Sequence, residues 1–462
     1  MRRIVLFGYR GTGKTAVGSV LAQDLGVPFL DTDALIEQQA GRPIPEIFRD
    51  EGEARFRARE REVIASLPGH DVVVATGGGV VMDPANMEHL RKESTCVLLT
   101  ADPEIIGRRL AQAPRPALTT LPPEAEVAEM LARRRPAYAA AADFCVETGK
   151  TTNHGAARRI LGLLRNGNIP DAAREAAVRW FAQTPLPAPE RVQLEARLTG
   201  PGHDPQTRFL GVAGWPCGHS RSPHLFNSLF ERYRLNCHYT RFEAPAIGPI
   251  METARAIDAK GLSVTIPFKQ DIMSCLDEID DAALQIGAAN TVVFACGTAY
   301  GWNTDWLGIR KPLAGLTGTR AVLLGAGGVA AAAAYALMDL GMEVTILNRT
   351  PEKARALAGR AGCRWGAWDD FEKADPDLVV NATPVGMQPD TNSPLRDDQL
   401  KKEMTVCDLV YTPPVTPLIA AARKAGCTTI TGTEIFIYQA QEQFRLFFGI
   451  EIPDTTLREI LA

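Results

Sequence analysis

The chain has 462 residues, which is long for one domain, and its length predicts two main halves. Hydrophobic residues make up 45% and charged residues 23%, as in ordinary globular proteins, and a formal net charge of −4 argues against a binding surface for nucleic acid or for an anionic membrane. Eighteen apolar residues never run together, so the sequence predicts no membrane span.

The N-terminus and the cysteines favour a reducing compartment. The first residues, M-R-R-I-V-L-F-G, pass directly into a glycine-rich loop, so no cleavable signal peptide fits before it. The nine cysteines are scattered without a C-x-x-C pair, which argues against a disulfide framework and against a structural zinc site. We therefore expect a cytoplasmic protein with reduced cysteines.

A glycine-rich loop near the N-terminus carries the first functional signal. The apolar run 4–7 leads into G-Y-R-G-T-G-K-T at 8–15, and residues 16–25 have helical periodicity. In this P-loop the glycines let the backbone N–H groups turn toward phosphate, the lysine reaches the β- and γ-phosphates, and the threonine hydroxyl binds Mg²⁺. The predicted nucleotide-binding residues are Gly11, Thr12, Gly13, Lys14 and Thr15.

Polar and glycine-rich segments follow the next two predicted strands. Asp31 and Asp33 come after the short apolar run 28–30, and because parallel strands open onto a ligand crevice at their carboxyl ends, we expect them to face Mg²⁺ and a polar substrate. Alternatively, one of the two caps a helix at 34–39. The strand at 72–75 runs into T-G-G-G at 76–79, which predicts close approach of the backbone to a ligand.

These motifs together resemble shikimate kinase. The P-loop, the D-x-D at 31–33, the F-R-x-x-E at 56–60, the G-G-G at 77–79, the R-P at 115 and the R-x-P-x-Y at 134–138 occur in the family's order. The resemblance implies that shikimate is held by Asp33, Arg57, Gly78, Gly79 and Arg134, with the two arginines on its carboxylate. It also implies that Arg108 lies against adenine and that Arg115 belongs to a mobile lid, although the lid segment 113–118 is shorter and richer in proline than usual.

Phosphoryl transfer needs positioned cations more than covalent chemistry. Lys14, Arg115 and Mg²⁺, the last held by Thr15 and Asp31, would supply these cations, and Asp33 would orient or deprotonate the attacking hydroxyl.

The segment 166–207 is predicted to be a linker between the halves. Asn166-Gly167-Asn168 ends the preceding helix, one further helix is expected over 172–183, and the proline-rich run 184–189 is a stiff spacer. Trp180 and Phe181 suggest that this helix packs on a domain surface or on a partner chain.

The second half begins with motifs that leave polar side chains after predicted strands. The strand 209–214 leads to H-S-R-S-P at 219–223, a strand from 261 is expected to end in Lys269, and A-N-T and N-T-D follow at 289–291 and 303–305. The strand 320–324 then enters G-A-G-G-V-A and an alanine-rich helix through 337, a dinucleotide fingerprint in the right context. The next strand, 343–347, ends in N-R-T, where Arg349 favours the 2′-phosphate of NADP unless it is a solvated loop residue.

This half resembles shikimate dehydrogenase, on the motifs above together with N-A-T-P-V-G-M at 381–387, D-L-V-Y at 408–411 and the segment 432–444. The resemblance implies that Ser220, Ser222, Thr265, Asn290 and Gln439 bind the substrate and that Lys269 and Asp305 are the catalytic pair, with the ammonium able to protonate a developing alkoxide. The implied dinucleotide contacts are Gly325, Ala326, Gly327, Gly328, Val329, Asn348, Arg349, Thr350, Thr383, Met387 and Gly432.

Two positions depart from the family pattern. Ser263 stands where the family usually has Asn, and T-E-I-F at 433–436 replaces the usual L-G-M-L. Both departures resemble versions fused to a type I 3-dehydroquinase, but the chain has no room for that domain. The choice between shikimate and quinate therefore stays open at this stage.

The expected fold class is α/β throughout. We predict a P-loop kinase domain at 1–165 with a parallel sheet like that of nucleoside monophosphate kinases, the linker at 166–207, a substrate-binding lobe at 208–310, a Rossmann NADP-binding lobe at 311–430, and C-terminal helices at 431–462 that return to the substrate lobe.

The expected function is two consecutive steps, NADPH-dependent reduction of 3-dehydroshikimate to shikimate and ATP- and Mg²⁺-dependent phosphorylation of shikimate. The alternatives are a dehydrogenase of relaxed specificity that also oxidises quinate, or one half that acts only as a binding or regulatory module. The expected partners are small molecules, with neither nucleic acid nor membrane, and a homo-oligomer is compatible with the sequence.

Overall fold

The computed structural model describes residues 1–112, 119, 121–201, 203–316 and 320–461. Arg115 and most of the predicted lid lie outside the described residues. Two compact units make up the chain: unit 1 holds Met1–Leu262, Val293–Ala299 and Phe444–Glu451, and unit 2 holds Ser263–Val292, Tyr300–Gln443 and Ile452–Ala462. The domain boundaries expected from the sequence stay a prediction.

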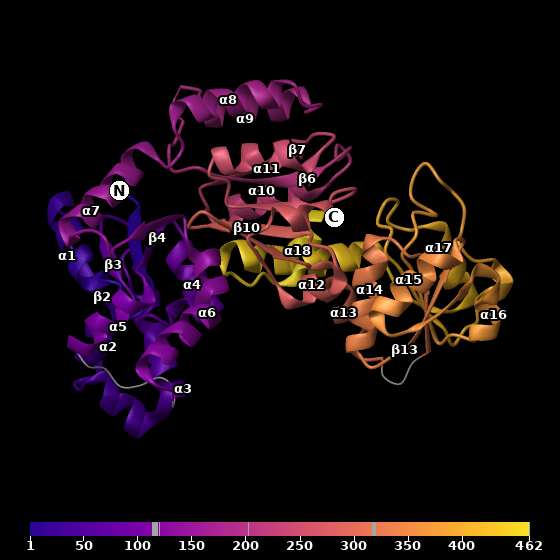
Figure 1. The fold of residues 1–462 in the computed structure, drawn as a ribbon, viewed down its shortest axis with the longest axis horizontal. Helices are drawn as coiled ribbons and strands as arrows, with labels where there is room; N and C mark the ends of the chain where they lie inside the picture. Colours follow the sequence, from indigo (N-terminus) through magenta and orange to yellow (C-terminus); the bar gives the residue numbers. More distant parts are fainter. Residues whose placement is uncertain (113–118, 120, 202, 317–319, 462) are drawn as a thin grey trace. The chain divides into compact units, whose positions relative to one another are not determined.

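The N-terminal part of unit 1 is built on a parallel sheet of order β2-β3-β1-β4-β5 (Figure 1). Its strands are β1 (Arg3–Phe7), β2 (Phe29–Asp31), β3 (Val73–Ala75), β4 (Ser94–Thr100) and β5 (Phe144–Glu147). The surrounding helices are α1 (Lys14–Leu25), α2 (Thr32–Ala40), α3 (Ile44–Ala65), α4 (Pro84–Arg91), α5 (Pro103–Gln112), α6 (Pro123–Ala141) and α7 (Asn153–Asn166). Apolar residues of β1 and β4 pack against α1 and α7, with Leu6, Leu21 and Ile160 fully buried, so these helices cover one face of the sheet.

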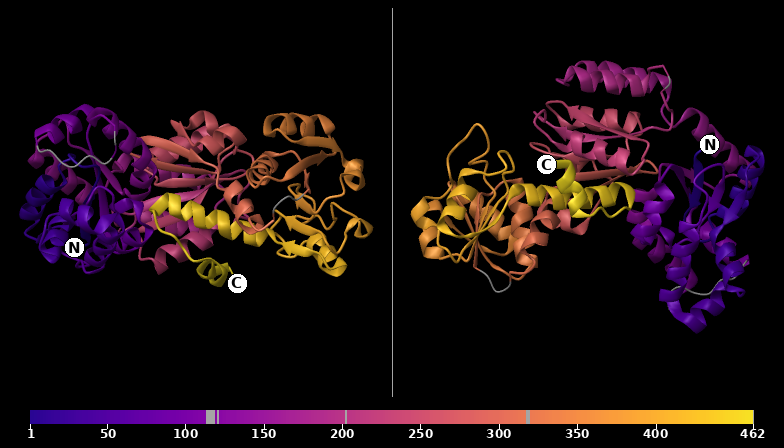
Figure 2. Two further views of the ribbon diagram at one scale, coloured as in Figure 1. Left: turned by 90° about the horizontal axis from the view of Figure 1, so that it is seen from below. Right: turned by 180° about the vertical axis from the view of Figure 1, so that it is seen from behind.

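The linker differs from the sequence prediction because it contains a second helix. After α8 (Asp171–Ala182) comes α9 (Ala188–Leu198), and the two helices contact each other; the right-hand view of Figure 2 shows them at the top. The predicted extended spacer is confirmed for 184–187 and wrong for 188–189, because Pro189 stands in the first turn of α9, where a missing backbone N–H costs no hydrogen bond. The expected packing of the aromatic residues is seen: Phe181 is buried, 5.2 Å between ring centroids from Phe242.

A second sheet follows, of order β7-β6-β8-β10-β11-β9. Its strands are β6 (Arg208–Gly214), β7 (Cys237–Glu243), β8 (Gly261–Val264), β9 (Glu278–Ile279), β10 (Thr291–Ala295) and β11 (Thr298–Trp302), and its helices are α10 (Ser222–Arg232), α11 (Ile247–Ala256) and α12 (Asp281–Ile286). The strand that leads toward Lys269 was predicted too long. β8 ends at Val264 because the next residues form a turn, closed by the N–H of Phe268 on the carbonyl of Thr265.

The third sheet, in unit 2, is wholly parallel and has the order β14-β13-β12-β15-β16-β17. Its strands are β12 (Arg320–Leu324), β13 (Glu343–Asn348), β14 (Arg364–Ala367), β15 (Leu378–Asn381), β16 (Thr405–Asp408) and β17 (Thr428–Ile430). Its helices are α13 (Asp305–Leu313), α14 (Gly328–Asp339), α15 (Pro351–Ala361), α16 (Phe371–Ala374) and α17 (Pro417–Ala425). Successive residues of β12 point to opposite faces of the sheet. Leu323 packs with α14 on one face and Leu324 packs with α17 on the other, so both faces are covered. The expected α/β class with parallel sheets is confirmed.

The chain ends in α18 (Gly432–Phe448) and α19 (Asp454–Leu461). The last turns of α18 belong to unit 1, where Phe444 and Phe448 meet Phe230 in a cluster of buried rings. In the described part of the chain, no helix is both long and apolar enough to span a membrane.

The expectation that the cysteines are all reduced was wrong for one pair. Cys145, in β5, and Cys296, in the turn between β10 and β11, form a disulfide across a sequence separation of 151 residues. No spacing pattern could reveal a pair that only the tertiary structure brings together. The remaining cysteines of the described chain are free thiols.

A fully buried lysine lies within unit 1, between the N-terminal sheet and the second sheet. The ammonium of Lys260 donates a hydrogen bond of 2.6 Å to the carbonyl of Ala142 and stands 5.6 Å from the ring centroid of Phe448. Burial lowers the pKa of Lys260 to about 7, and the nearby positive charges of Arg91 and Arg208 lower it further, against the opposing effect of Asp143.

This burial makes the stability of the protein depend on pH. Between pH 7 and about 10 the unfolded chain keeps a proton that folded Lys260 has lost, so the contribution of Lys260 to the free energy of unfolding becomes more favourable as pH rises. We predict that the stability of the wild type relative to Lys260→Met rises by about 2 kcal/mol from pH 7 to pH 9. Urea unfolding of both proteins at the two pH values measures the difference, and an equal pH dependence in both would contradict the prediction.

Candidate functional site

The P-loop runs from β1 to α1 and keeps its backbone close to the neighbouring strand. Gly8, Gly11 and Gly13 all have positive φ, and a Cβ on Gly8 would stand 2.3 Å from the carbonyl oxygen of Leu99 in β4. Only glycine fits there without moving the strand. The loop therefore turns sharply enough to leave its N–H groups at the start of α1, where the helix dipole also favours phosphate.

Lys14 and Thr15 open α1 at this loop. The ammonium of Lys14 donates hydrogen bonds to the carbonyls of Gly8 at 2.9 Å and Tyr9 at 3.0 Å, which hold it over the loop. The hydroxyl of Thr15 donates to Oδ2 of Asp31 at 2.8 Å. A hydroxyl and a carboxylate are hard oxygen ligands of the kind Mg²⁺ takes when the rest of its shell is phosphate and water, so this pair fits the metal.

Asp31 serves two purposes that the sequence left as alternatives. Its Oδ1 accepts the N–H of Asp33 at 3.0 Å and so caps α2, while its Oδ2 holds Thr15. Asp33 lies in the first turn of α2, close to the glycines that follow β3: a Cβ on Gly77 would be 2.8 Å from its carboxylate.

The glycines after β3 face two arginines. The guanidinium of Arg134 donates to the carbonyl of Gly78 at 3.0 Å, and that of Arg57 lies 2.9 Å from where a Cβ on Gly79 would stand. Arg57 also donates to Oε2 of Glu60 at 2.9 Å. Burial raises the pKa of Glu60, the Arg57 charge works against that rise, and Asp33 adds to it. Thus the sheet edge brings together Asp33, both arginines and the glycines predicted to hold the substrate.

Three contacts at this site were missed by sequence reasoning. Arg109, and not the exposed Arg108, reaches the P-loop, donating to the carbonyl of Gly11 at 3.1 Å and to that of Thr148 at 2.9 Å. The hydroxyl of Thr148, just after β5, donates to the carbonyl of Thr12 at 2.9 Å. Tyr138 donates to the carbonyl of Gly78 at 2.7 Å, and burial raises its pKa to about 12. The R-x-P-x-Y motif contained Tyr138, whereas nothing local pointed to Thr148.

The close approach at Gly8 can be tested against a matched glycine. Gly8→Ala should weaken ATP binding at least tenfold, since the added methyl would push the loop off the carbonyl of Leu99. Gly26→Ala is the control: Gly26 also has positive φ, at 67°, but no heavy atom lies within 4 Å of its Cβ position, so the change should cost only about 1 kcal/mol of stability. Titration with a fluorescent ATP analogue compares the two, and equal affinities would contradict the prediction.

In unit 2, the carboxylate of Asp305 joins the predicted catalytic pair to an asparagine. Oδ2 of Asp305 accepts from the ammonium of Lys269 at 2.6 Å, and Oδ1 accepts from Nδ2 of Asn290 at 2.8 Å. Only 8% of the Asp305 side chain and 18% of the Lys269 side chain are exposed. Asp305 is the first residue of α13, where the helix dipole favours a negative charge.

Asn290 is fixed from several sides. Its Oδ1 accepts the N–H of Thr304 at 2.7 Å, and its Nδ2 lies 3.3 Å from Oε1 of Gln439 in α18. The structure thus brings Lys269, Asp305, Asn290 and Gln439 together, and Thr265 lies in the turn that leads to Lys269. Ser220 and Ser222 belong to unit 1, where the hydroxyl of Ser220 accepts the N–H of Ser222 at the start of α10.

Ser263, the departure noted in the sequence, has a buried partner. Its hydroxyl donates to Oε1 of Gln443 at 2.9 Å, and Nε2 of Gln443 donates to the hydroxyl of Thr291 at 3.1 Å. Gln443 was missed because it lies 180 residues away on α18. The pair supports the strand that begins next to Asn290.

The Rossmann fingerprint lines a pocket of about 440 Å³. Gly325 has a φ of 108°, and its Cβ position is 3.0 Å from the carbonyl of Ala382, so the loop after β12 lies directly against the loop after β15. The predicted residues that line the pocket are Gly325, Ala326, Gly327, Asn348, Arg349, Thr350 and Thr383.

The remaining predicted dinucleotide residues lie around this pocket without lining it. Gly328 and Val329 begin α14, Gly432 begins α18, and Met387 is exposed. Lys353 lines the pocket and was missed, although it follows Arg349 by one helical turn. Thr383 is positioned by Asn381, which accepts its hydroxyl hydrogen at 2.6 Å and donates to Asp408 at 2.9 Å. Burial raises the pKa of Asp408.

Comparison with known proteins identifies similar families for both parts of the chain. Residues 10–165 match the shikimate kinase family model, residues 212–292 the model of the shikimate dehydrogenase substrate binding domain, and residues 309–428 the shikimate / quinate 5-dehydrogenase model. The NADP(+) shikimate dehydrogenase of Methanopyrus kandleri is 38% identical over 276 residues, which cover 55% of this chain and 95% of that protein.

Solved structures resemble the same part of the chain. The shikimate 5-dehydrogenase of Thermus thermophilus in complex with NADP(H) and shikimate has a TM-score of 0.52 at 33% identity, covering 55% of this chain and 98% of its own. The quinate dehydrogenase of Corynebacterium glutamicum in complex with NAD gives the same TM-score, identity and coverage.

Proposed function

The chain belongs to the shikimate dehydrogenase family and carries a shikimate kinase domain before it, and we propose that this bifunctional enzyme makes shikimate by NADPH-dependent reduction of 3-dehydroshikimate and then phosphorylates it with ATP. The observation that supports the proposal is that the described residues of each predicted catalytic set lie close together, Arg115 being outside the described residues. Lys269 is ion-paired to Asp305 in one site, and Lys14, Thr15, Asp31 and Asp33 surround the P-loop in the other.

In the dehydrogenase site, Lys269 is the proton donor for the substrate oxygen. A ketone reduced by hydride becomes an alkoxide, and an ammonium beside it can neutralise the developing charge. Asp305 keeps that ammonium in place and Asn290 keeps Asp305 in place, so the proton is held at one atom, Nζ of Lys269. NADPH supplies the hydride when bound; the pocket with Arg349 and Lys353 would hold its 2′-phosphate.

In the kinase site, Arg57 and Arg134 bind the carboxylate of shikimate, and Asp33 orients the hydroxyl that is phosphorylated. The two guanidinium groups face the glycines after β3, whose lack of side chains leaves the arginines close to the backbone. Lys14 stabilises charge on the transferring phosphoryl group, and Thr15 and Asp31 would hold Mg²⁺, which would neutralise negative charge on the phosphates.

A second candidate substrate is quinate. Ser263 stands where the family usually has Asn, and its hydroxyl is bonded to Gln443 in the interior. This arrangement supports Ser263 as a residue that shapes the site indirectly, and the departure from Asn leaves quinate open as a second substrate. Assays with quinate and NAD, run beside shikimate and NADP, decide between strict and relaxed specificity.

The cellular setting of the proposal is the cytoplasm, where NADPH and ATP are both available. Its partners are the small-molecule substrates, without nucleic acid or membrane, and the enzyme can act as a monomer or a homo-oligomer. Size-exclusion chromatography with light scattering gives the oligomeric state.

Substitution of one lysine in each site tests the two activities separately. Lys269→Ala should reduce the dehydrogenase kcat at least 1,000-fold, roughly 4 kcal/mol, and leave phosphorylation of shikimate unchanged, because only the proton donor is removed. Lys14→Ala should do the reverse. The measurement is NADPH oxidation with 3-dehydroshikimate, followed by shikimate 3-phosphate formation after addition of Mg·ATP. Loss of both activities in either folded variant would refute independent sites, and a silent half in the wild type would favour the regulatory-module alternative.

Arg349 should decide the choice of dinucleotide. Arg349→Ala should raise the KM for NADPH at least tenfold with little change for NADH, since only NADPH carries the phosphate that the guanidinium would bind. Arg355→Ala, in the helix α15 that begins two residues after Arg349, is the matched control, because Arg355 contacts the ring of Trp365 and not the pocket. Equal effects of Arg349→Ala on both dinucleotides would count against the role of Arg349.

A further inference from the structure

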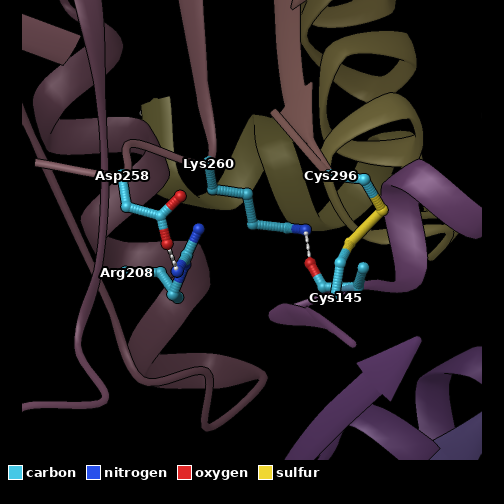
Figure 3. Close-up of a disulfide and its surroundings, with 6 residues drawn as sticks. Cys145, Arg208, Asp258, Lys260 and Cys296 are labelled. Carbon is cyan, nitrogen blue, oxygen red and sulfur yellow. Dashed lines mark hydrogen bonds and ion pairs between the residues drawn. A yellow bond between two sulfur atoms is a disulfide. The ribbon is translucent and has the colours of Figure 1, made fainter. Parts of the chain in front are cut away.

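One covalent bond joins the kinase domain to the substrate lobe of the dehydrogenase within unit 1. Figure 3 shows the disulfide between Cys145, in strand β5 of the kinase sheet, and Cys296, at the tip of the hairpin formed by β10 and β11. The proposed activities make no use of these two thiols. The role of this disulfide therefore has to be sought outside the two catalytic sites.

The backbone conformation at Cys296 is unfavourable for cysteine, which indicates that the residue serves through its sulfur atom and not as a turn former. Cys296 has a φ of 51° and Gly297 a φ of 81°, so both central residues of this two-residue hairpin turn are left-handed. Asn or Asp followed by Gly is the usual choice at such a turn, because those side chains tolerate the left-handed conformation. A cysteine pays a conformational cost at the first position, which a turn residue alone would not require.

Solvent thiols can reach the bond. Cys296 is exposed and Cys145 is half-buried, and both line a pocket of about 270 Å³ together with Arg159, Arg208 and Asp258. Among the described residues the free cysteines Cys96, Cys217, Cys237 and Cys407 are buried, and burial raises the pKa of the first three thiols to about 12. The Cys145–Cys296 pair is thus open to exchange in a way that those thiols are not.

Non-covalent contacts hold the same two surfaces beside the disulfide. Lys260 of the dehydrogenase lobe donates to the carbonyl of Ala142, three residues before Cys145 (Figure 3). The guanidinium of Arg208, which pairs with Asp258 of its own lobe, lies 5.4 Å from the ring centroid of Phe144 in β5. Breaking the disulfide would leave these contacts in place. The disulfide can therefore be reduced and formed again while the two domains stay packed against each other.

The disulfide is anchored in strands that lead to catalytic residues of both activities. Three residues after Cys145, Thr148 bonds the carbonyl of Thr12 in the P-loop. The hairpin that carries Cys296 begins after Asn290 and ends before Asp305 in the chain. Thr148, and Arg109 that bonds it, therefore connect the end of β5 to the P-loop by hydrogen bonds.

We propose that Cys145 and Cys296 are a reversible redox modification site, which locks the kinase domain to the dehydrogenase lobe under oxidising conditions and releases the lock when a dithiol reduces it. In a reducing compartment an exposed disulfide is transient and regulatory rather than structural. Reduction loosens β5 and lowers the stability of the kinase domain, while the polar contacts keep the domains together.

The exchange is balanced with a small dithiol as reductant. A thiolate of the dithiol attacks one sulfur of the pair, forming a mixed disulfide and releasing the other cysteine as a thiolate. The second thiol of the reductant then attacks the mixed disulfide, so the protein ends with two thiols and the reductant with one disulfide. Oxidised glutathione reverses the reaction through the same kind of intermediate, releasing two molecules of reduced glutathione.

Peptide mapping of the full chain tests whether the bond forms. The protein is equilibrated with oxidised glutathione or with dithiothreitol, without denaturant, then alkylated and digested with trypsin. Cys275 and Cys296 fall in the same tryptic peptide, 270–310, so Cys275→Ser is the control that assigns the partner. Wild type and Cys275→Ser should both show the Cys145 peptide linked to 270–310 after oxidation and free after dithiothreitol.

Thermal unfolding under the same two conditions tests what the bond does. Reduction should lower the first unfolding midpoint of wild type and Cys275→Ser by about 5 °C or more, since the bond closes a long loop. Cys145→Ser and Cys296→Asn should show no response to dithiothreitol. Cys296→Asn is the sharper variant, because it removes the sulfur and gives the turn a residue that its backbone prefers.

The outcomes separate this proposal from the enzymatic one, because neither readout requires activity. Alkylated Cys145 after oxidation, a link that dithiothreitol removes only in denaturant, or an equal shift of the midpoint in Cys296→Asn would each overturn it. A redox response confined to proteins that hold both cysteines supports it.

Discussion

Both nucleotide-binding loops depend on the same constraint, the close approach of a loop backbone to the carbonyl groups at the end of a neighbouring parallel strand. The first glycine after β1 lies against the end of β4, and the first glycine after β12 lies against the segment after β15. No side chain fits at either place, and the positive φ of Gly8 and Gly325 turns each chain toward its helix. In the kinase part, Asp31 and the glycines after β3 come from strands of the same sheet, so these polar and glycine residues arrive at the same edge as the P-loop.

In both sites, a carboxylate that bears charge is oriented by hydrogen bonds from neutral groups. Asp305 divides its two oxygens between a lysine and an asparagine, and the asparagine is itself fixed by backbone and side-chain donors. Asp31 likewise divides its oxygens between a helix N-terminus and a hydroxyl. Each carboxylate thus keeps a defined orientation without a second ionised partner that would compete for the substrate.

Much of this could be predicted from the sequence because the signals are local. A P-loop, a strand followed by glycines, and an arginine after the second Rossmann strand each carry their meaning within a few residues, and the strands that flank them were located to within two residues at most ends. Gln443, Thr148 and Lys260 could not be found in this way, because each acts on a residue more than 100 positions away. The helix α9 was missed for a different reason: its prolines were interpreted as an extended spacer, although one of them stands in the first turn of a helix.

The buried Lys260 also bears on whether the two enzymes could exist apart. Its ammonium, the carbonyl of Ala142 and the ring of Phe448 satisfy one another only while the kinase domain and the dehydrogenase lobe are in one chain and folded together. Arg91 adds to this by stacking on the same ring from the kinase side, 5.1 Å from its centroid. A dehydrogenase cut free at the linker would present an aromatic, positively charged patch to water. The packing of the kinase domain on this lobe therefore covers groups that either part alone would expose.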